Sequence, residues 1–183
     1  MHLHENETIG SVLHAVAARY PERMAVIDAD RRLSYAELDR LVDQAAASLL
    51  SLGIKKADHV GIWAKDDALT LTTLYALWRI GAVPVPLCTS FLRTELETCC
   101  QAADVTFLFA GIGHKGQEFA QTIGNLQIPV TVCPIDRLLD CSGHPLEAVA
   151  AAEALVAPSD PDTILFTSGT TGYAKPVVTS HYA

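Results

Sequence analysis

A run of hydroxyl and glycine residues near the C-terminus contains the side chains best suited to chemistry in this sequence. After an apolar stretch at 164–166, the chain continues with Thr167, Ser168, Gly169, Thr170, Thr171 and Gly172 and, after two further residues, with Lys175. Glycines let the backbone approach an anion, hydroxyls donate hydrogen bonds to phosphate oxygens, and a lysine adds positive charge. The segment 167–175 is therefore predicted to bind phosphate groups.

This segment differs from a Walker A loop, in which the lysine stands between glycine and a serine or threonine. Here Lys175 stands between Ala174 and Pro176, and residues 176–179 favour a strand. No helix N-terminus is therefore expected beneath the loop, and binding must come from the hydroxyls, local amides and Lys175. The alternative interpretation is a surface hairpin that binds nothing.

A second glycine-rich segment runs from Gly111 to Gly116 and fits the pattern G-x-G-x-x-G, with Asp136 twenty residues beyond it. That spacing is typical of dinucleotide binding, which makes an NAD-dependent oxidoreductase an alternative function. The helix that would follow is short, however, because it meets Gly124 within about two turns. A glycine turn between two elements is the preferred interpretation.

The elements that must position these segments alternate between helices and strands. Helices are expected at 9–20, 35–52, 67–80, 93–103, 117–123 and 145–156, and strands at 24–28, 59–64, 83–87, 105–109, 130–133 and 163–167. A capping box from Ser34 to Glu37 opens the second helix. Pro84 and Pro86 each remove a backbone donor, so their strand is expected at an edge or bend. The pattern predicts an α/β fold with a mostly parallel sheet and helices on both faces.

Composition excludes several classes of protein. A net charge of −8 with no basic stripe argues against a nucleic-acid partner. The most apolar segment, residues 68–87, is interrupted by Arg79 and Gly81, so no membrane span and no integral membrane contact are expected. The first ten residues have no apolar run, so no targeting segment is expected there. Seven dispersed histidines predict no metal site, and five cysteines without C-x-x-C spacing favour reduced thiols and a cytoplasmic location.

Several segments together resemble one family of enzymes. They read LSYAELDRLVDQAAASLLSLGIKKADHVGIWAKD, LYALWRIGAVPVPL, DPDTILFTSGTTG and TSGTTGYAK. In this order they resemble the AMP-binding (adenylate-forming) superfamily, and more closely its fatty- or small-acid CoA synthetases than its peptide-synthetase modules. The resemblance covers nearly the whole chain. It implies that residues 1–183 are the N-terminal portion of an AMP-binding domain, the large domain of such an enzyme, ending just after the phosphate loop at 167–175.

The resemblance also implies a reaction and a set of ligands. A carboxylic acid would react with ATP and Mg²⁺ to give an acyl-adenylate, and coenzyme A would then accept the acyl group. Residues Thr167, Ser168, Gly169, Thr170, Thr171, Gly172 and Lys175 would hold the β- and γ-phosphates. The family usually has proline before the lysine and glycine after it, and Pro176 removes an N–H from that position.

The family's adenine-binding, ribose-binding and catalytic lysine segments lie downstream of the phosphate loop. No catalytic residue is therefore identified within the 183 residues, and the chain alone is expected to be inactive. We also expect it to self-associate, because the strand at 163–167 would lie in a sheet whose later strands are missing. The alternative from another class is a stand-alone nucleotide-binding or interaction module without catalysis.

Overall fold

A four-stranded parallel sheet lies at the centre of the computed structural model, which describes residues 7–114, 117–140, 145–167 and 175–182. Its strands are β3 (His59–Trp63), β4 (Val83–Pro86), β5 (Phe107–Ala110) and β8 (Thr131–Pro134), in the order β4-β3-β5-β8. All three pairings are parallel. The predicted α/β fold with a mostly parallel sheet is confirmed.

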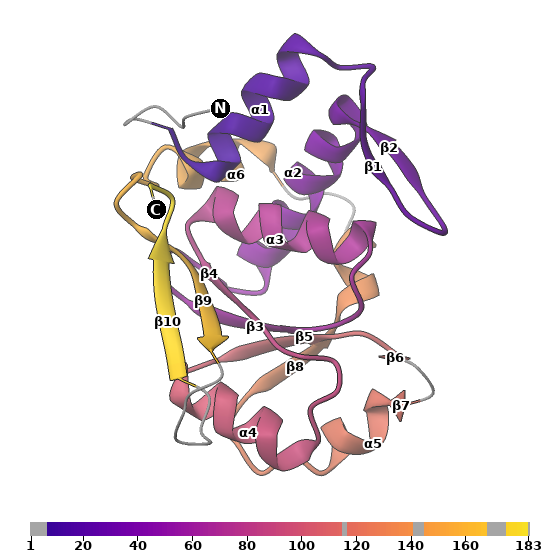
Figure 1. The fold of residues 1–183 in the computed structure, drawn as a ribbon. Helices are drawn as coiled ribbons and strands as arrows, with labels where there is room; N and C mark the ends of the chain where they lie inside the picture. Colours follow the sequence, from indigo (N-terminus) through magenta and orange to yellow (C-terminus); the bar gives the residue numbers. More distant parts are fainter. Residues whose placement is uncertain (1–6, 115–116, 141–144, 168–174, 183) are drawn as a thin grey trace.

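Helices cover both faces of this sheet (Figure 1). One side has α1 (Ile9–Arg19), α2 (Tyr35–Ser51), α3 (Ala68–Ile80) and α6 (Leu146–Glu153), and the other has α4 (Arg93–Ala102) and α5 (Phe119–Gly124). A 3₁₀ helix, η1 (Ile135–Leu139), follows β8. Because α3 and α4 lie on opposite faces, the crossover from β3 to β4 and the return from β4 to β5 run in opposite directions along the sheet.

Short sequence signals fix the ends of these helices. The backbone N–H of Ser34 donates to Glu37 Oε2 at 2.8 Å, and the Glu37 N–H donates to Ser34 Oγ at 3.3 Å, which confirms the capping box. Asp67 caps α3 by accepting from the Thr70 N–H at 2.8 Å. Gly81 ends α3 with φ of 71°, a left-handed conformation that favours glycine.

Alternate side chains of β3 enter two separate cores, as the period of a strand requires. Val60 and Ile62 pack in the cluster that contains the buried residues of α2 and α3. Trp63 packs with α4 and stacks on Phe119 of α5, with ring centroids 3.7 Å apart. The sheet is thus buried on both faces, which explains its nearly continuous apolar strands.

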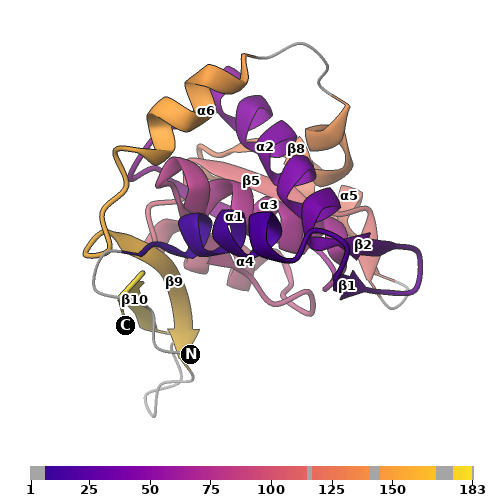
Figure 2. The ribbon, with the colours of Figure 1, turned by 90° about the horizontal axis from the view of Figure 1, so that it is seen from above.

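β4 is an edge strand of the four-stranded sheet, as Pro84 and Pro86 predicted. Three antiparallel ribbons complete the fold. They are β1 (Met24–Ile27) with β2 (Arg32–Ser34), β6 (Gly113–His114) with β7 (Gln117–Glu118), and β9 (Pro161–Thr167) with β10 (Lys175–Ser180). Figure 2 shows the first and last of these ribbons at opposite ends of the molecule. β9 is not hydrogen bonded to the four-stranded sheet.

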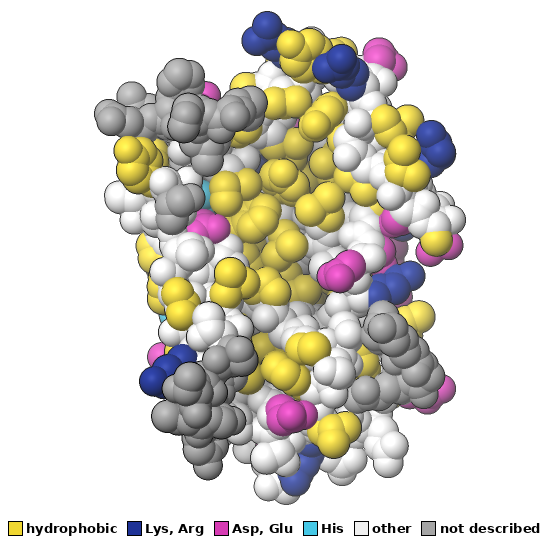
Figure 3. All heavy atoms as spheres, in the orientation of Figure 1, with side chains coloured by type: hydrophobic (Ala, Val, Ile, Leu, Met, Phe, Trp, Pro, Cys, Tyr) yellow, Lys and Arg dark blue, Asp and Glu magenta, His cyan; other side chains and the backbone are white. Residues whose placement is uncertain are grey.

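The surface carries a broad apolar area. Figure 3 shows apolar side chains gathered near the middle of the face on which α3 lies in Figure 1. Leu165, Val177 and Val178 add exposed apolar side chains on the β9–β10 ribbon. In the described part of the chain, no helix combines the length and apolar character needed to cross a bilayer.

Candidate phosphate-binding site

The β9–β10 ribbon holds the two ends of the hydroxyl-rich segment together. In its register Lys175 lies directly opposite Thr167, and Pro176 lies opposite Phe166. Both Thr167 and Lys175 are exposed to solvent. The register therefore places a threonine and a lysine opposite each other at the end of the ribbon, and their side chains are of the kind that donates to an anion.

Five other predicted site residues lie outside the described residues: Ser168, Gly169, Thr170, Thr171 and Gly172. Strands were predicted on both sides of this segment, and the structure pairs them as an antiparallel ribbon. Pro176 is accommodated because β10 pairs only with β9 among the described strands, so its missing N–H breaks no second ladder.

The base of β9 is fastened to α3. The indole Nε1 of Trp78 donates to the carbonyl oxygen of Asp162 at 2.8 Å and contacts Thr163 Oγ1 at 3.3 Å. The hydroxyl of Thr163 in turn donates to Asp162 Oδ2 at 2.7 Å. Ile164, the next residue, is buried in the cluster that contains Trp63 and the buried residues of α4. These contacts fix the ribbon that holds Thr167 relative to the central sheet.

The far end of β10 is fastened to α1 through a buried histidine. His181 is 1% exposed, and its Nδ1 accepts from the Ile9 N–H at 3.3 Å. Burial lowers the pKa of His181, and the charges of Asp162 and Asp160 offset only part of this effect. The imidazole is therefore neutral at physiological pH, and its Nε2 has no hydrogen-bond partner among the described residues.

A surface ion pair holds the turn that precedes β9. Lys56 Nζ lies 2.7 Å from Asp160 Oδ2 and donates to the Leu155 carbonyl at 2.6 Å. The hydrogen bond from Lys56 lowers the pKa of Asp160. The sequence gives no sign of this contact, because Leu155 is about a hundred positions from Lys56.

The second glycine segment, marked by β6, lies on the right in Figure 1, whereas β10 lies on the left. Gly111 follows β5 and Asp136 follows β8, so the structure brings these two residues to neighbouring strand ends. The ribbon β6–β7 separates Gly111 from α5, which has only six residues. No helix therefore starts at the glycines, which argues against the dinucleotide interpretation. Lys115 and Gly116 lie outside the described residues.

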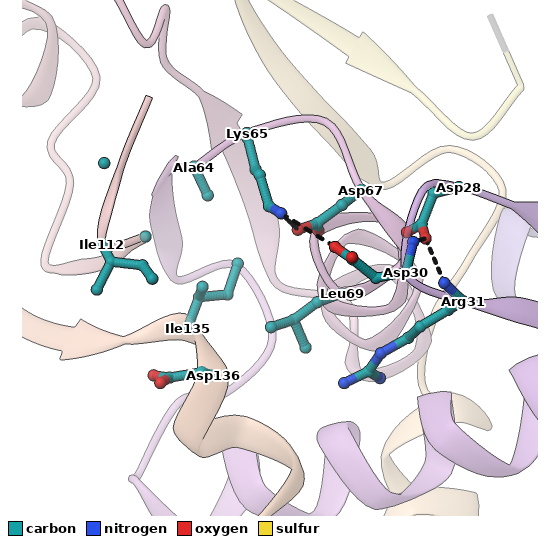
Figure 4. A pocket seen from close by; sticks show the side chains of 12 residues that line it. Asp28, Asp30, Arg31, Ala64, Lys65, Asp67, Leu69, Ile112, Ile135 and Asp136 are labelled. Carbon is teal, nitrogen blue, oxygen red and sulfur yellow. Dashed lines mark hydrogen bonds and ion pairs between the residues drawn. The ribbon is translucent and has the colours of Figure 1, made fainter. Parts of the chain in front are cut away.

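A cavity of about 240 Å³ lies at these strand ends (Figure 4). Lys65 follows β3, and its Nζ lies 3.5 Å from Asp67 Oδ2 and 3.6 Å from Asp30 Oδ2. The charge of Asp67, followed by their hydrogen bond, raises the pKa of Lys65. Lys65 was not among the predicted site residues, although a charged residue directly after a buried parallel strand is a usable signal for a site.

Metal-binding chemistry has no obvious place in the described residues, where no group of three or more His, Cys, Asp or Glu side chains is arranged to hold an ion. Four of the five cysteines are described, at 88, 99, 100 and 133, and all four are free thiols. Burial raises the pKa of Cys100 to about 12, so this thiol is a packing residue rather than a nucleophile.

An open parallel sheet covered by helices, with a separate ribbon that closes a Ser/Thr/Gly segment, defines an α/β domain with a candidate phosphate loop. The family model described as "AMP-binding enzyme" matches residues 13–183. The chain belongs to this family of adenylate-forming enzymes.

The relatives include one protein named as a CoA ligase and one named as an AMP ligase and S-ArCP synthetase. A (methyl-dioxo-octahydro-indenyl)propanoyl:CoA ligase of Mycobacterium tuberculosis is 33% identical over 190 residues, which cover 98% of this chain and 38% of that protein. A salicyl-AMP ligase / salicyl-S-ArCP synthetase of the same organism is 32% identical, with 95% of this chain and 33% of that protein covered. The chain thus spans between 33% and 38% of the length of these relatives.

Solved structures show the same fold. The N-terminal domain of FACL13 from Mycobacterium tuberculosis superimposes with a TM-score of 0.81 at 25% identity. The match covers 96% of this chain and 44% of that domain. The arrangement of sheet, helices and ribbon is therefore the one found in the N-terminal domains of adenylate-forming enzymes.

Proposed function

We propose that residues 1–183 are the N-terminal portion of the AMP-binding domain of an acyl-CoA synthetase. The carboxylate of the substrate would attack the α-phosphorus of ATP, forming an acyl-adenylate and releasing pyrophosphate. The thiol of coenzyme A would then attack the acyl carbon, forming a thioester and releasing AMP. Family membership and the CoA ligase among the relatives support this reaction.

The observation that carries the proposal is the placement of Thr167 opposite Lys175 at the end of a fastened ribbon. We propose that Thr167 and Lys175, together with Ser168, Gly169, Thr170, Thr171 and Gly172, hold the β- and γ-phosphates of ATP. Their contribution would be positioning and charge stabilisation, without a covalent step. Hydroxyl and ammonium donors fit phosphate oxygens, and Mg²⁺ bound to those oxygens would supply further positive charge.

A carrier-protein thiol is a second candidate acceptor, because one relative is named as a salicyl-S-ArCP synthetase. Thioester formation with coenzyme A, measured against a carrier protein that bears a phosphopantetheine arm, distinguishes the two acceptors. We also propose a cytoplasmic location, since Cys99 and Cys100 are adjacent in α4 and remain buried free thiols.

The replacement Lys175→Ala in the full-length enzyme tests the phosphate role. Loss of one charge-assisted contact of about 1.5–3 kcal/mol should lower kcat/KM for ATP by roughly 10–150-fold. The apparent affinity for the carboxylic acid should stay nearly unchanged. Lys55→Ala is the matched control, because Lys55 is an exposed lysine far from β10 in the sequence. Normal ATP kinetics for Lys175→Ala would remove Lys175 from the site.

The 183-residue chain alone is expected to give no carboxylate-dependent ATP–pyrophosphate exchange, since it corresponds to only 38% of the length of the CoA ligase relative. Exchange by the purified monomer would place the catalytic groups within these residues. Binding of ATP without exchange, even in the full-length protein, would favour the non-catalytic module instead. The exposed apolar residues Leu165, Val177 and Val178 support our proposal that the chain self-associates.

A further inference from the structure

The sheet order creates a ligand-binding position that is separate from the phosphate loop. Along the order β4-β3-β5-β8, the chain leaves β3 towards β4 and then returns past β3 to β5 and β8. The crossovers therefore diverge between β3 and β5, where a crevice opens at the carboxyl ends of the strands. The cavity of about 240 Å³ is lined by Ala64 after β3, Gly111 after β5 and Ile135 after β8.

The wall contributed by the β1–β2 turn is held rigidly. The carboxylate of Asp28 accepts backbone N–H groups of Asp30 at 2.8 Å, Arg31 at 2.6 Å and Ala68 at 2.7 Å. These bonds, with that of Ala68 the largest, lower the pKa of Asp28. Because Ala68 begins α3, Asp28 fastens the turn to the helix that borders the cavity. The cavity is thus a formed site rather than a gap beneath a loose turn.

Most of the charged groups in the cavity are already paired. Its ionisable lining residues are Asp28, Asp30, Arg31, Lys65, Asp67 and Asp136. Asp28 is used by backbone amides, and Lys65 lies between Asp30 and Asp67. The guanidinium of Arg31 and the carboxylate of Asp136 make no hydrogen bond or ion pair with any residue that the structure describes.

These two groups lie on opposite sides of the cavity, with the side chain of Leu69 between them (Figure 4). Ile112 borders the same cavity and is 92% exposed, so its apolar surface is open to contact by a ligand. The site therefore offers one cationic donor, one anionic acceptor and an apolar lining between them. A ligand that matches it has opposite charges at its two ends and an aliphatic body.

Other ligand classes fit less well. A phosphate would meet four carboxylates against two cations, and the Gly111 N–H is already donated to the Trp63 carbonyl at 3.0 Å. A dinucleotide fits less well because, in the described residues around Gly111, a short ribbon stands where a phosphate-binding helix would begin. We propose that this cavity binds a small zwitterion of the amino-acid type, with Arg31 on its carboxylate and Asp136 on its ammonium group.

Titration of the ¹⁵N-labelled full-length enzyme tests this proposal. The probes are β-alanine, 4-aminobutyrate and 6-aminohexanoate, which share both charged ends and differ in length. Butyrate and butylamine are the matched controls, because each keeps one charged end of 4-aminobutyrate. We expect saturable shifts of the amides of Ala64, Leu69 and Gly111 with at least one zwitterion, and binding weaker by about tenfold or more with both controls.

Two variants with matched neighbours assign the contacts. Arg31→Gln and Asp136→Asn should each weaken binding of the best zwitterion by about tenfold, since each removes one charge-assisted contact. Arg32→Gln and Asp140→Asn make the same charge changes at exposed residues outside the cavity lining and should leave binding unchanged. Unaltered thermal unfolding of all four variants would show that they fold.

The proposal is overturned if none of the three zwitterions gives saturable shifts at the cavity. It is also overturned if butyrate or butylamine binds as tightly as the best zwitterion, or if Arg31→Gln behaves like Arg32→Gln. Lys175→Ala should leave this binding intact, because Lys175 is not among the residues that line the cavity. The outcome is therefore independent of the proposed phosphate site.

Discussion

Replacing the buried Arg79 should destabilise the domain more than replacing any exposed arginine. The side chain of Arg79 is fully buried, and its guanidinium lies 2.6 Å from both Asp39 and Asp43 of α2. Its Nε also lies 3.7 Å from Glu153 of α6. Burial pulls the pKa of Arg79 down, but the hydrogen bonds and charges of Asp39 and Asp43 outweigh it and raise the pKa above its usual range. One charged residue of α3 thus links three helices.

The expected cost follows from what Arg79→Ala leaves behind. Breaking a fully buried ion pair costs about 3–5 kcal/mol, because the remaining charge loses its partner. The side chains of Asp39 and Asp43 are 14% and 31% exposed, so water compensates part of that loss. The buried aliphatic stem of the arginine adds a packing loss. We expect about 3 kcal/mol, which for a chain of this length lowers Tm by roughly 6–12 °C.

Thermal unfolding followed by circular dichroism measures this effect. Arg40→Ala is the matched control, because Arg40 is exposed on α2 and makes one hydrogen bond, to Gln44. Arg79→Lys should fall between the two, since a lysine keeps the charge but cannot donate to both aspartates in the same geometry. A Tm for Arg79→Ala within about 2 °C of the Arg40→Ala value would refute the stabilising role of this cluster.

Two further perturbations test the ends of α3 and β10. Gly81→Ala should lower the free energy of unfolding by about 1–2 kcal/mol because of its left-handed φ, and by more because the added Cβ would lie 3.0 Å from Val156 Cγ2. Gly53→Ala is the control, since Gly53 also has a left-handed φ but an added Cβ there would meet no atom within 4 Å. Urea unfolding of both variants therefore separates the cost of the contact with Val156 from the cost of the backbone conformation. Acidification through pH 6.5 should lower the free energy of unfolding, because the unfolded chain then binds a proton that the buried neutral His181 does not. His181→Asn keeps an acceptor for the Ile9 N–H and should flatten this part of the pH profile; an unchanged slope would contradict the assignment.

The sequence predicted features that depend on neighbouring residues. The capping box at Ser34, the helix expected at 67–80 and the edge position of the Pro84 strand all follow from local backbone chemistry, and the structure confirms each. The alternation of helices and strands likewise predicted the fold class. The candidate phosphate loop could be proposed for the same reason, since its hydroxyls, glycines and lysine lie close together in the sequence.

Contacts between distant segments were not predictable in this way. Arg79 and Asp39 are forty positions apart, and nothing in a one-dimensional pattern indicates that their side chains meet. The same holds for Trp78 and Asp162, which fasten β9 to α3. These contacts depend on which helix faces pack together, and the helical period alone leaves the choice of neighbouring helix open.

The glycine segment at 111–116 shows how sheet order changes the meaning of a motif. As a string it matches a dinucleotide fingerprint, with Asp136 at the expected distance. In the fold, the Gly111 N–H belongs to the sheet ladder, and a short ribbon stands where a helix would begin. The order β4-β3-β5-β8 still places a crevice between β3 and β5. Arg31 and Asp136 line this crevice, and both belong to segments outside the glycine motif. The position of a ligand therefore follows from the topology, whereas its chemical class follows from the side chains that the topology brings together.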